Sequence, residues 1–205
     1  MTAVLYIVRH GNTFEAGDVV TRVGGRTDLK LSPSGEAQAH ALAQHFVDSY
    51  VAFASARSGP LKRTRRTAEV ILAAQIGAQI AAPELTTDLF LREIDYGPDE
   101  NRPEAEVIAR IGAAALAAWE HEAIPPADWR VDPAAVIGNW QETFAELRAA
   151  EGAHLIVTSN GIARFALLAA GAARAESKLA TGAYGVIELG ASDETIKGWN
   201  IRPTA

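Results

Sequence analysis

The sequence predicts an α/β fold, and two features of its 205 residues support this prediction. Short, continuous apolar stretches, typical of strands buried on both faces, alternate with longer segments whose apolar residues recur at helical spacing. Polar clusters containing arginine, histidine and serine follow directly after the predicted strands. A chain of this length with 48% hydrophobic residues can also build a sizeable core. We therefore expect a single domain over residues 1–205.

The first half of the chain is expected to run strand, helix, strand, helix. Residues 3–8 form an apolar run rich in β-branched and aromatic side chains, as in a buried strand. A glycine-containing loop follows, and Ser34 is the expected N-cap of the first helix. A second strand is predicted at residues 51–55. The helix predicted at residues 61–76 begins after a proline and ends before a glycine.

Two alanine-rich helical patterns, at residues 103–122 and 133–151, occupy the middle of the chain. A loop with two prolines and a tryptophan separates them. We expect a helical cap, or insertion, around residues 92–140. Beyond it the sequence predicts a strand, a helix and two closing strands, at residues 154–158, 161–170, 183–189 and 195–199.

The composition excludes several classes of function. The chain has no cysteine, which removes disulfides, thiolate metal ligands and a cysteine nucleophile. Its formal net charge of −6 provides no global positive field for nucleic acid or anionic lipid. The N-terminal residues lack a basic leader followed by a long apolar stretch, and no apolar run approaches membrane length. We therefore expect a soluble, cytoplasmic protein without nucleic-acid or membrane partners.

Three polar clusters are expected to meet at one edge of the sheet. They follow the first, second and third predicted strands, at residues 9–13, 57–66 and 158–161. In open α/β sheets, ligands collect at the carboxyl ends of strands, where loops and helix N-termini supply side chains and free N–H groups. These distant segments should therefore converge on one site. The 14–32 loop and the 92–140 insertion should supply the residues that contact the rest of the substrate.

His10 is the strongest candidate for a reactive side chain, because the end of a strand places its imidazole at this edge. Neutral imidazole has a free lone pair, and with an unperturbed pKa of about 6.5 it can act as a nucleophile near neutral pH. The alternative is a histidine that is only hydrogen-bonded into its loop.

Arg9 and Arg63 favour the reactive interpretation of His10, because guanidinium groups bind phosphate oxygens through paired donors. For most of the basic residues at 57–66, a solvated helix face is the simpler explanation. A nucleic-acid surface is a third explanation. It is disfavoured because the run lacks interleaved aromatic residues and the whole chain is acidic.

Glu93 lies among apolar neighbours in a loop with glycine and proline, where a buried carboxyl group could donate a proton to a leaving oxygen. A solvated loop carboxylate is the alternative. The chain lacks a Gly-Lys-Ser/Thr phosphate loop, a Gly-x-Ser-x-Gly elbow and a His-Glu-x-x-His helix. His40 and His45 are five residues apart, which does not align two imidazoles on one helical face. We therefore expect neither a metal nor a cofactor.

Three segments carry recognisable motifs. Residues 8–13 read Val-Arg-His-Gly-Asn-Thr, residues 22–39 read RVGGRTDLKLSPSGEAQA, and residues 58–69 read SGPLKRTRRTAE. In this order they resemble the Arg-His-Gly-x-Thr, Gly-x-x-Gln-Ala and Ser-x-Leu-x-Arg-Ala-x-x-Thr-Ala segments of the histidine phosphatase superfamily, also called the phosphoglycerate mutase-like family. The resemblance spans most of the chain. It implies a three-layer α/β/α sandwich with a mostly parallel central sheet.

The resemblance also implies a role for each candidate residue. His10 would be phosphorylated transiently, and Glu93 would donate and later accept the proton. The expected phosphate-binding residues are Arg9, Thr13, Arg63, Asn160 and Gly161.

The chain departs from the family pattern at two positions. After the late strand the family usually has Ser-His-Gly, whereas this chain has Asn160 in place of the histidine. An amide can donate a hydrogen bond to a phosphoryl oxygen but supplies no positive charge. Ala16 occupies a position where the family often carries an asparagine. Each departure removes one expected phosphate contact or weakens it.

The first functional hypothesis is a phosphomonoesterase acting on a phosphorylated small molecule through a phosphohistidine at His10. A phosphoglycerate mutase-like phosphotransferase is the closest alternative. The sugar-acid mutases of the family that this sequence resembles are longer and carry a Glu-Arg-His-Tyr-Gly segment. At the corresponding place, residues 92–97 of this sequence read Arg-Glu-Ile-Asp-Tyr-Gly. A third alternative is a catalytically weak member that binds phosphorylated ligands or a partner protein, which Asn160 favours. The oligomeric state stays open, with a homodimer among the alternatives.

Overall fold

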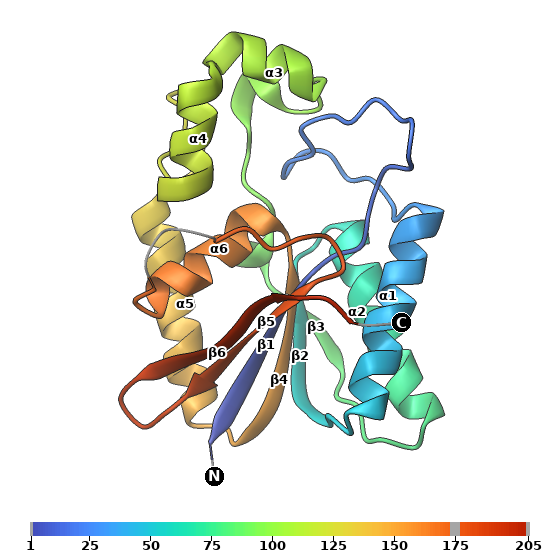
Figure 1. Cartoon of the computed structure of the whole chain (residues 1–205). Coiled ribbons are helices and arrows are strands. Elements are labelled where there is room, and N and C mark those ends of the chain that lie inside the picture. Colours follow the sequence, from blue (N-terminus) through green and yellow to red (C-terminus); the bar gives the residue numbers. More distant parts are fainter. Residues whose placement is uncertain (1, 173–176, 204–205) are drawn as a thin grey trace.

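The computed structural model describes residues 2–172 and 177–203, and a six-stranded sheet runs through its centre (Figure 1). The strand order is β3-β2-β4-β1-β5-β6. The first four of these strands are parallel, and the last two join as an antiparallel pair. The strands are β1 (Ala3–Arg9), β2 (Phe53–Ser58), β3 (Leu85–Thr87), β4 (Gly152–Thr158), β5 (Tyr184–Leu189) and β6 (Glu194–Ile201).

Helices cover both faces of the sheet. In Figure 1, α1 and α2 lie on one side of the strands, α5 and α6 on the other, and α3 and α4 extend beyond the end of the sheet. The helices are α1 (Pro33–Asp48), α2 (Lys62–Gly77), α3 (Glu104–Ile111), α4 (Ala113–Glu122), α5 (Pro133–Arg148) and α6 (Asn160–Ala169), with short 3₁₀ turns η1 (Leu89–Leu91) and η2 (Gly97–Asp99). The predicted three-layer α/β/α sandwich with a mostly parallel sheet is confirmed.

Two apolar clusters fill the space between the layers. Strand β1 contributes to both, since Leu5 and Ile7 pack on the side of α5 and α6, and Val8 packs on the side of α1 and α2. Successive side chains of a strand point to opposite faces, so a central strand with helices on both sides needs apolar residues at nearly every position. This requirement explains the continuous apolar run at the start of the chain. Trp140 and Phe46, both fully buried, are the largest core side chains of α5 and α1, respectively.

Several predicted boundaries are wrong in detail. The N-cap of α1 is Ser32, whose side chain accepts a hydrogen bond from the backbone of Gly35, because Pro33 already occupies the first turn. The helical pattern predicted at residues 103–122 is two helices, since Gly112 adopts a φ of 83° between them.

Other differences concern strands. The strand expected at residues 51–55 lies at Phe53–Ser58, and the short edge strand β3 was not predicted. Strand β3 has only three residues, too few to show a period in the sequence.

The register of the parallel strands brings the three polar clusters together. Arg9 at the end of β1 is opposite Thr158 at the end of β4, and Ser58 of β2 is opposite Val157. The segments that follow these strands therefore begin at the same edge of the sheet. Among the described residues, no helix has the length and apolar character needed to cross a membrane.

Candidate active site

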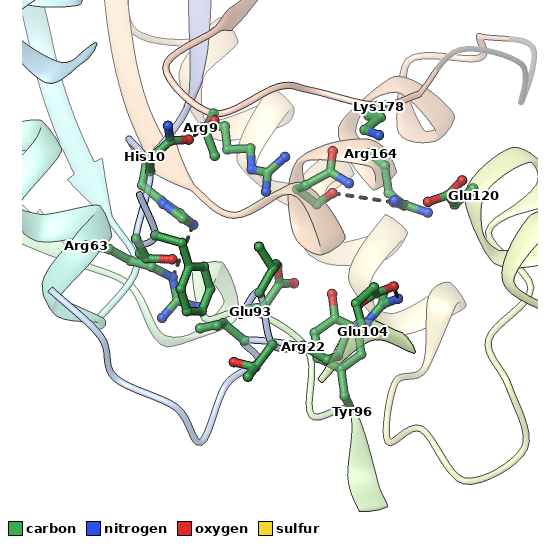
Figure 2. Close-up of a pocket in the computed structure, with 18 of the residues that line it drawn as sticks. Arg9, His10, Arg22, Arg63, Glu93, Tyr96, Glu104, Glu120, Arg164 and Lys178 are labelled. Atoms are coloured by element: carbon green, nitrogen blue, oxygen red, sulfur yellow. Dashed lines mark hydrogen bonds and ion pairs between the residues drawn. The ribbon is translucent and has the colours of Figure 1, made fainter. Parts of the chain in front are cut away.

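A cavity of about 640 Å³ opens at the carboxyl ends of β1 and β4. Its walls come from the loop after β1, the start of α2, the segment around Glu93, helices α3 and α4, the beginning of α6, and the loop that precedes β5. Figure 2 shows Arg9, His10 and Arg63 at one end, Arg164 and Lys178 at the other, and Glu93 between them. The structure thus brings all three predicted clusters to one cavity. The 14–32 loop and the 92–140 insertion both line it as well.

His10 is buried, and two hydrogen bonds define the state of its ring. Its Nδ1 lies 2.7 Å from the carbonyl oxygen of Gly11, and because a carbonyl only accepts, Nδ1 must carry the proton. Its Nε2 accepts a hydrogen bond from Nε of Arg63 at 3.1 Å. Burial, followed by the nearby charges of Arg63 and Arg9, lowers the pKa of His10 well below its usual value of 6.5. The ring is therefore neutral, and its lone pair is on Nε2.

The loop after His10 packs tightly against the start of α1. A Cβ added to Gly11 would lie 2.2 Å from the carbonyl oxygen of Gly35, so only glycine permits this approach. The backbone N–H of Gly11 donates to the hydroxyl of Thr67 on α2 at 3.3 Å. Two helices therefore hold the loop that positions the imidazole.

Arg63 is 1% exposed and uses each of its three nitrogens. In addition to the bond to His10, Nη1 donates to the carbonyl of Thr27 at 2.8 Å and Nη2 to that of Gly24 at 3.3 Å. Burial lowers the pKa of Arg63, and the charge of Glu93 opposes this shift. Arg63 thus joins the histidine to the loop that follows β1.

Arg9 lies at the same end of the cavity as His10 and Arg63 (Figure 2). Its Nη1 donates to the carbonyl of Leu179 at 2.8 Å, whereas its buried Nε has no hydrogen-bond partner in the described part of the chain. Burial lowers the pKa of Arg9, and the charge of Glu93 again opposes this shift. Arg9 and Arg63 therefore place two cations beside the imidazole.

Glu93 is 7% exposed and is held by backbone donors. Its Oε1 accepts from the N–H of Ile94 at 2.9 Å, and its Oε2 accepts from the N–H of Gly161 at 3.3 Å. A Cβ on Gly161 would lie 2.1 Å from Oε1, so glycine is required for this contact. Gly161 therefore contacts the carboxylate in this structure, and its role in phosphate binding stays a prediction.

Asn160 lies in the cavity, where its amide has a defined orientation. Its Oδ1 accepts from the backbone N–H of Leu179 at 2.7 Å. This hydrogen bond fixes which amide atom is the oxygen and leaves Nδ2 as the donor. Nδ2 is a donor without a protein partner among the described residues. Thr13 and Ala16, the other two residues singled out near the first motif, also line the cavity.

The other basic residues at 57–66 lie outside the cavity and form surface ion pairs. Arg57 pairs with Glu146, and Lys62 with Asp28 at 3.6 Å. Arg66 pairs with Glu36 on α1 at 2.9 Å. Lys62 and Arg66 thus lie on the solvated helix face expected for most of this run, whereas Arg57 belongs to strand β2 and is partly buried.

Sequence reasoning missed the residues that line the far end of the cavity. They are Arg22, Tyr96, Trp119, Lys178 and, above all, Arg164. One signal could have identified Arg164, since it follows Asn160 by four residues in a helix and therefore shares its face. Nothing in the sequence indicates that the loop at 177–182 approaches β1. No group of three or more histidine, aspartate or glutamate residues able to hold a metal ion is found in the residues that the structure describes.

Comparison with known families agrees with this geometry. The sequence model of the histidine phosphatase superfamily (branch 1) matches residues 5–202. The chain belongs to the histidine phosphatase superfamily. The predicted resemblance is thereby confirmed.

Other superfamily members are similar to parts of this chain or to its fold. The curated "Probable phosphoglycerate mutase GpmB" of Yersinia pestis is 34% identical over 99 residues, which are 48% of this chain and 41% of that protein. The mycobacterial glucosyl-3-phosphoglycerate phosphatase structure aligns with a TM-score of 0.79 at 20% identity, covering 97% of this chain and 99% of that one. A phosphoglycerate mutase structure from Bacillus anthracis has a TM-score of 0.80 at 17% identity, covering 97% and 93%. The superfamily neighbours thus include both phosphatases and mutases.

Proposed function

We propose that this member of the superfamily is a metal-independent phosphomonoesterase that works through a phosphohistidine at His10. The observation that carries the proposal is the state of the imidazole: the ring is neutral, its Nδ1 proton is bonded to Gly11, and its Nε2 lone pair faces Arg63. A nucleophilic histidine needs this tautomer, because only the unprotonated nitrogen can attack.

In the first step, Nε2 of His10 attacks the phosphorus and the bond from phosphorus to the ester oxygen breaks. The Nε–H of Arg63 donates a hydrogen bond to Nε2 of His10. When substrate binds, this N–H must change its acceptor from Nε2 to a phosphoryl oxygen, so that Nε2 is free to attack. Arg9 supplies a second charged donor. Charged groups that are already oriented stabilise the transferring phosphoryl group without reorganising during the reaction.

Protonated Glu93 gives its proton to the leaving oxygen, which departs as an alcohol. In the second step Glu93 takes a proton from water, the water oxygen attacks the phosphorus, and the phosphorus–nitrogen bond breaks. Inorganic phosphate is released, and His10 returns to its neutral form. The position of the carboxyl group between the two ends of the cavity supports this role (Figure 2).

A phosphotransferase of the mutase type is the second candidate, because the curated relatives are named as phosphoglycerate mutases. Hydrolysis is preferred because residues 92–97 read Arg-Glu-Ile-Asp-Tyr-Gly and lack the Glu-Arg-His-Tyr-Gly segment of the sugar-acid mutases.

The test is an assay of the purified chain against a panel of phosphomonoesters, with and without EDTA. The proposal expects release of inorganic phosphate that EDTA does not change. A requirement for added magnesium or zinc would contradict it, and transfer of phosphate between two positions of 2- and 3-phosphoglycerate without hydrolysis would favour the mutase.

A further inference from the structure

The end of the cavity opposite His10 contains another buried guanidinium group, that of Arg164. This residue lies on α6 and is 3% exposed. Its Nε donates to the carbonyl of Asn160 at 3.4 Å and its Nη1 to the carbonyl of Trp119 at 2.6 Å. Its Cζ also lies 4.4 Å from the centroid of the Trp119 ring. These contacts hold the guanidinium in one plane at the cavity wall.

No ion pair joins Arg164 to a carboxylate in the part of the chain that the structure describes, and the charges of Glu93 and Glu120 favour the guanidinium only from a distance. By contrast, Arg22 at the same end of the cavity pairs with Glu104. Glu120 also lines this end, but its side chain is exposed and no ion pair joins it to Arg164. Nη2 of Arg164 has no protein acceptor among the described residues. Burial lowers the pKa of Arg164 despite these two carboxylates, and a buried guanidinium without a contacting anion is suited to a negatively charged ligand.

The position of Arg164 sets the size of that ligand. Arg164 follows Asn160 by one helical turn, and residues four apart on a helix have Cβ atoms about 5–6 Å from each other. Asn160 in turn shares Leu179 with Arg9, because Asn160 accepts from the N–H of Leu179 and Arg9 donates to its carbonyl. Nε of Arg164 lies 3.4 Å from the carbonyl oxygen of Asn160, so the guanidinium lies next to a residue that borders the proposed phosphate site.

We propose that Arg164 is a second anion site and that this chain acts on phosphomonoesters whose leaving group carries a carboxylate a few bonds from the ester oxygen. The fork formed by Nη2 and the remaining N–H of Nη1 matches the two oxygens of a carboxylate. Exposed Lys178, at the same end of the cavity (Figure 2), adds positive charge near the mouth. This inference rests on the proposed phosphatase function, and it assigns the substrate class of the same cavity.

The test compares two esters that differ in one group, 3-phosphoglycerate with a carboxylate and glycerol 3-phosphate with a hydroxymethyl group. For the unmodified chain we expect kcat/KM to be at least about tenfold higher with 3-phosphoglycerate. Arg164→Gln should lower kcat/KM for 3-phosphoglycerate by about 10- to 100-fold and for glycerol 3-phosphate by less than about threefold. Arg164→Lys should fall between, because it keeps the charge but loses the fork.

The matched control is Arg65→Gln, which removes the same charge from an exposed position on α2, where Arg65 pairs with Glu69 at 3.8 Å. This substitution should leave kcat/KM unchanged for both esters. An equal loss of kcat/KM for both esters in Arg164→Gln would overturn the inference. Arg164 would then stabilise the fold or bind the phosphate group that both esters share. Unaltered turnover of 3-phosphoglycerate would overturn it as well.

Calorimetry separates this inference from the proposed function. In the His10→Ala chain, which cannot form the phosphohistidine, 3-phosphoglycerate should bind more tightly than glycerol 3-phosphate. A second substitution, Arg164→Gln, should abolish that difference. If the unmodified chain hydrolyses no ester, the proposed function fails, but this binding difference would still support the second anion site. Equal binding of the two esters would overturn it.

Discussion

The Nε–H of Arg63 points at Nε2 of His10 across 3.1 Å, so the cation proposed to bind phosphate occupies the lone pair proposed to attack it. This contact favours the neutral ring, because protonating Nε2 would place a second positive charge against the guanidinium. It also means that an anion which binds at His10 must compete with Nε2 for the N–H of Arg63.

The first prediction concerns the titration of His10. Burial and the two arginines lower its pKa, so the imidazole should stay neutral from alkaline pH down to well below pH 6.5 and become protonated only in stronger acid. Arg63→Met should raise the pKa of His10, whereas Arg66→Met, at an exposed position of the same helix, should not. NMR of the imidazole is the proper measurement, because a phosphate ester itself titrates near pH 6. A pKa at or above 6.5 in the unmodified chain would contradict the account.

The second prediction concerns Glu93 as the proton donor. Glu93→Gln should lower kcat by about 10²- to 10⁴-fold on an alkyl phosphate, whose leaving oxygen needs a proton. With p-nitrophenyl phosphate the first step should be nearly unaffected, since nitrophenolate leaves without a proton. Stopped-flow absorbance should then show a burst of one nitrophenolate per chain, followed by slow hydrolysis without the base. The exposed control Glu69→Gln should behave like the unmodified chain, and the absence of a nitrophenolate burst in Glu93→Gln would argue against Glu93 as the proton donor.

The third prediction compares two glycines. Gly161→Ala should displace Glu93, because the new methyl group would lie 2.1 Å from Oε1, and both kcat and thermal stability should fall. Gly138→Ala on α5 meets nothing within 4 Å and should stabilise the chain by about 0.5–1 kcal/mol at unchanged activity. Thermal denaturation and steady-state assays measure both effects. If Gly161→Ala retained full kcat, the contact between Gly161 and Glu93 would have no role in turnover.

The fourth prediction separates the two functions of the Asn160 amide. Asn160→Asp keeps an oxygen to accept the N–H of Leu179, so the fold should be kept, but it replaces the donor with a negative charge. Inhibition by vanadate should weaken by about tenfold or more. Asn160→Ala should instead destabilise the chain by about 1–3 kcal/mol, because the N–H of Leu179 loses its acceptor. Unchanged vanadate inhibition in Asn160→Asp would place the amide outside the phosphate site.

Much of the fold followed from the sequence because its strongest signals are local. The apolar run of β1 and the polar residues that begin at Arg9 mark the strand and its end without reference to the rest of the chain. The parallel register then brings Arg9 opposite Thr158, as the rule for open α/β sheets predicts. The family assignment depended on motifs that are continuous in sequence, and it is confirmed by the match over residues 5–202.

What the sequence did not predict depends on contacts between distant segments. Ser34 is as good an N-cap by composition as Ser32, and only the structure shows which hydroxyl accepts from Gly35. Arg164 reads as an ordinary arginine in an apolar helix until Trp119, 45 residues earlier, is seen to bond with it. The function of each cavity residue stays a prediction, because position alone does not measure reactivity.

The most direct test of the central claim is to quench the chain in alkali during turnover and measure phosphate bound to protein by mass spectrometry. The account predicts up to one phosphate per chain, stable in alkali, lost in acid and located on His10. It also predicts that His10→Ala gives neither the phosphorylated peptide nor turnover. Phosphate on another residue, or substantial turnover by His10→Ala, would contradict the mechanism.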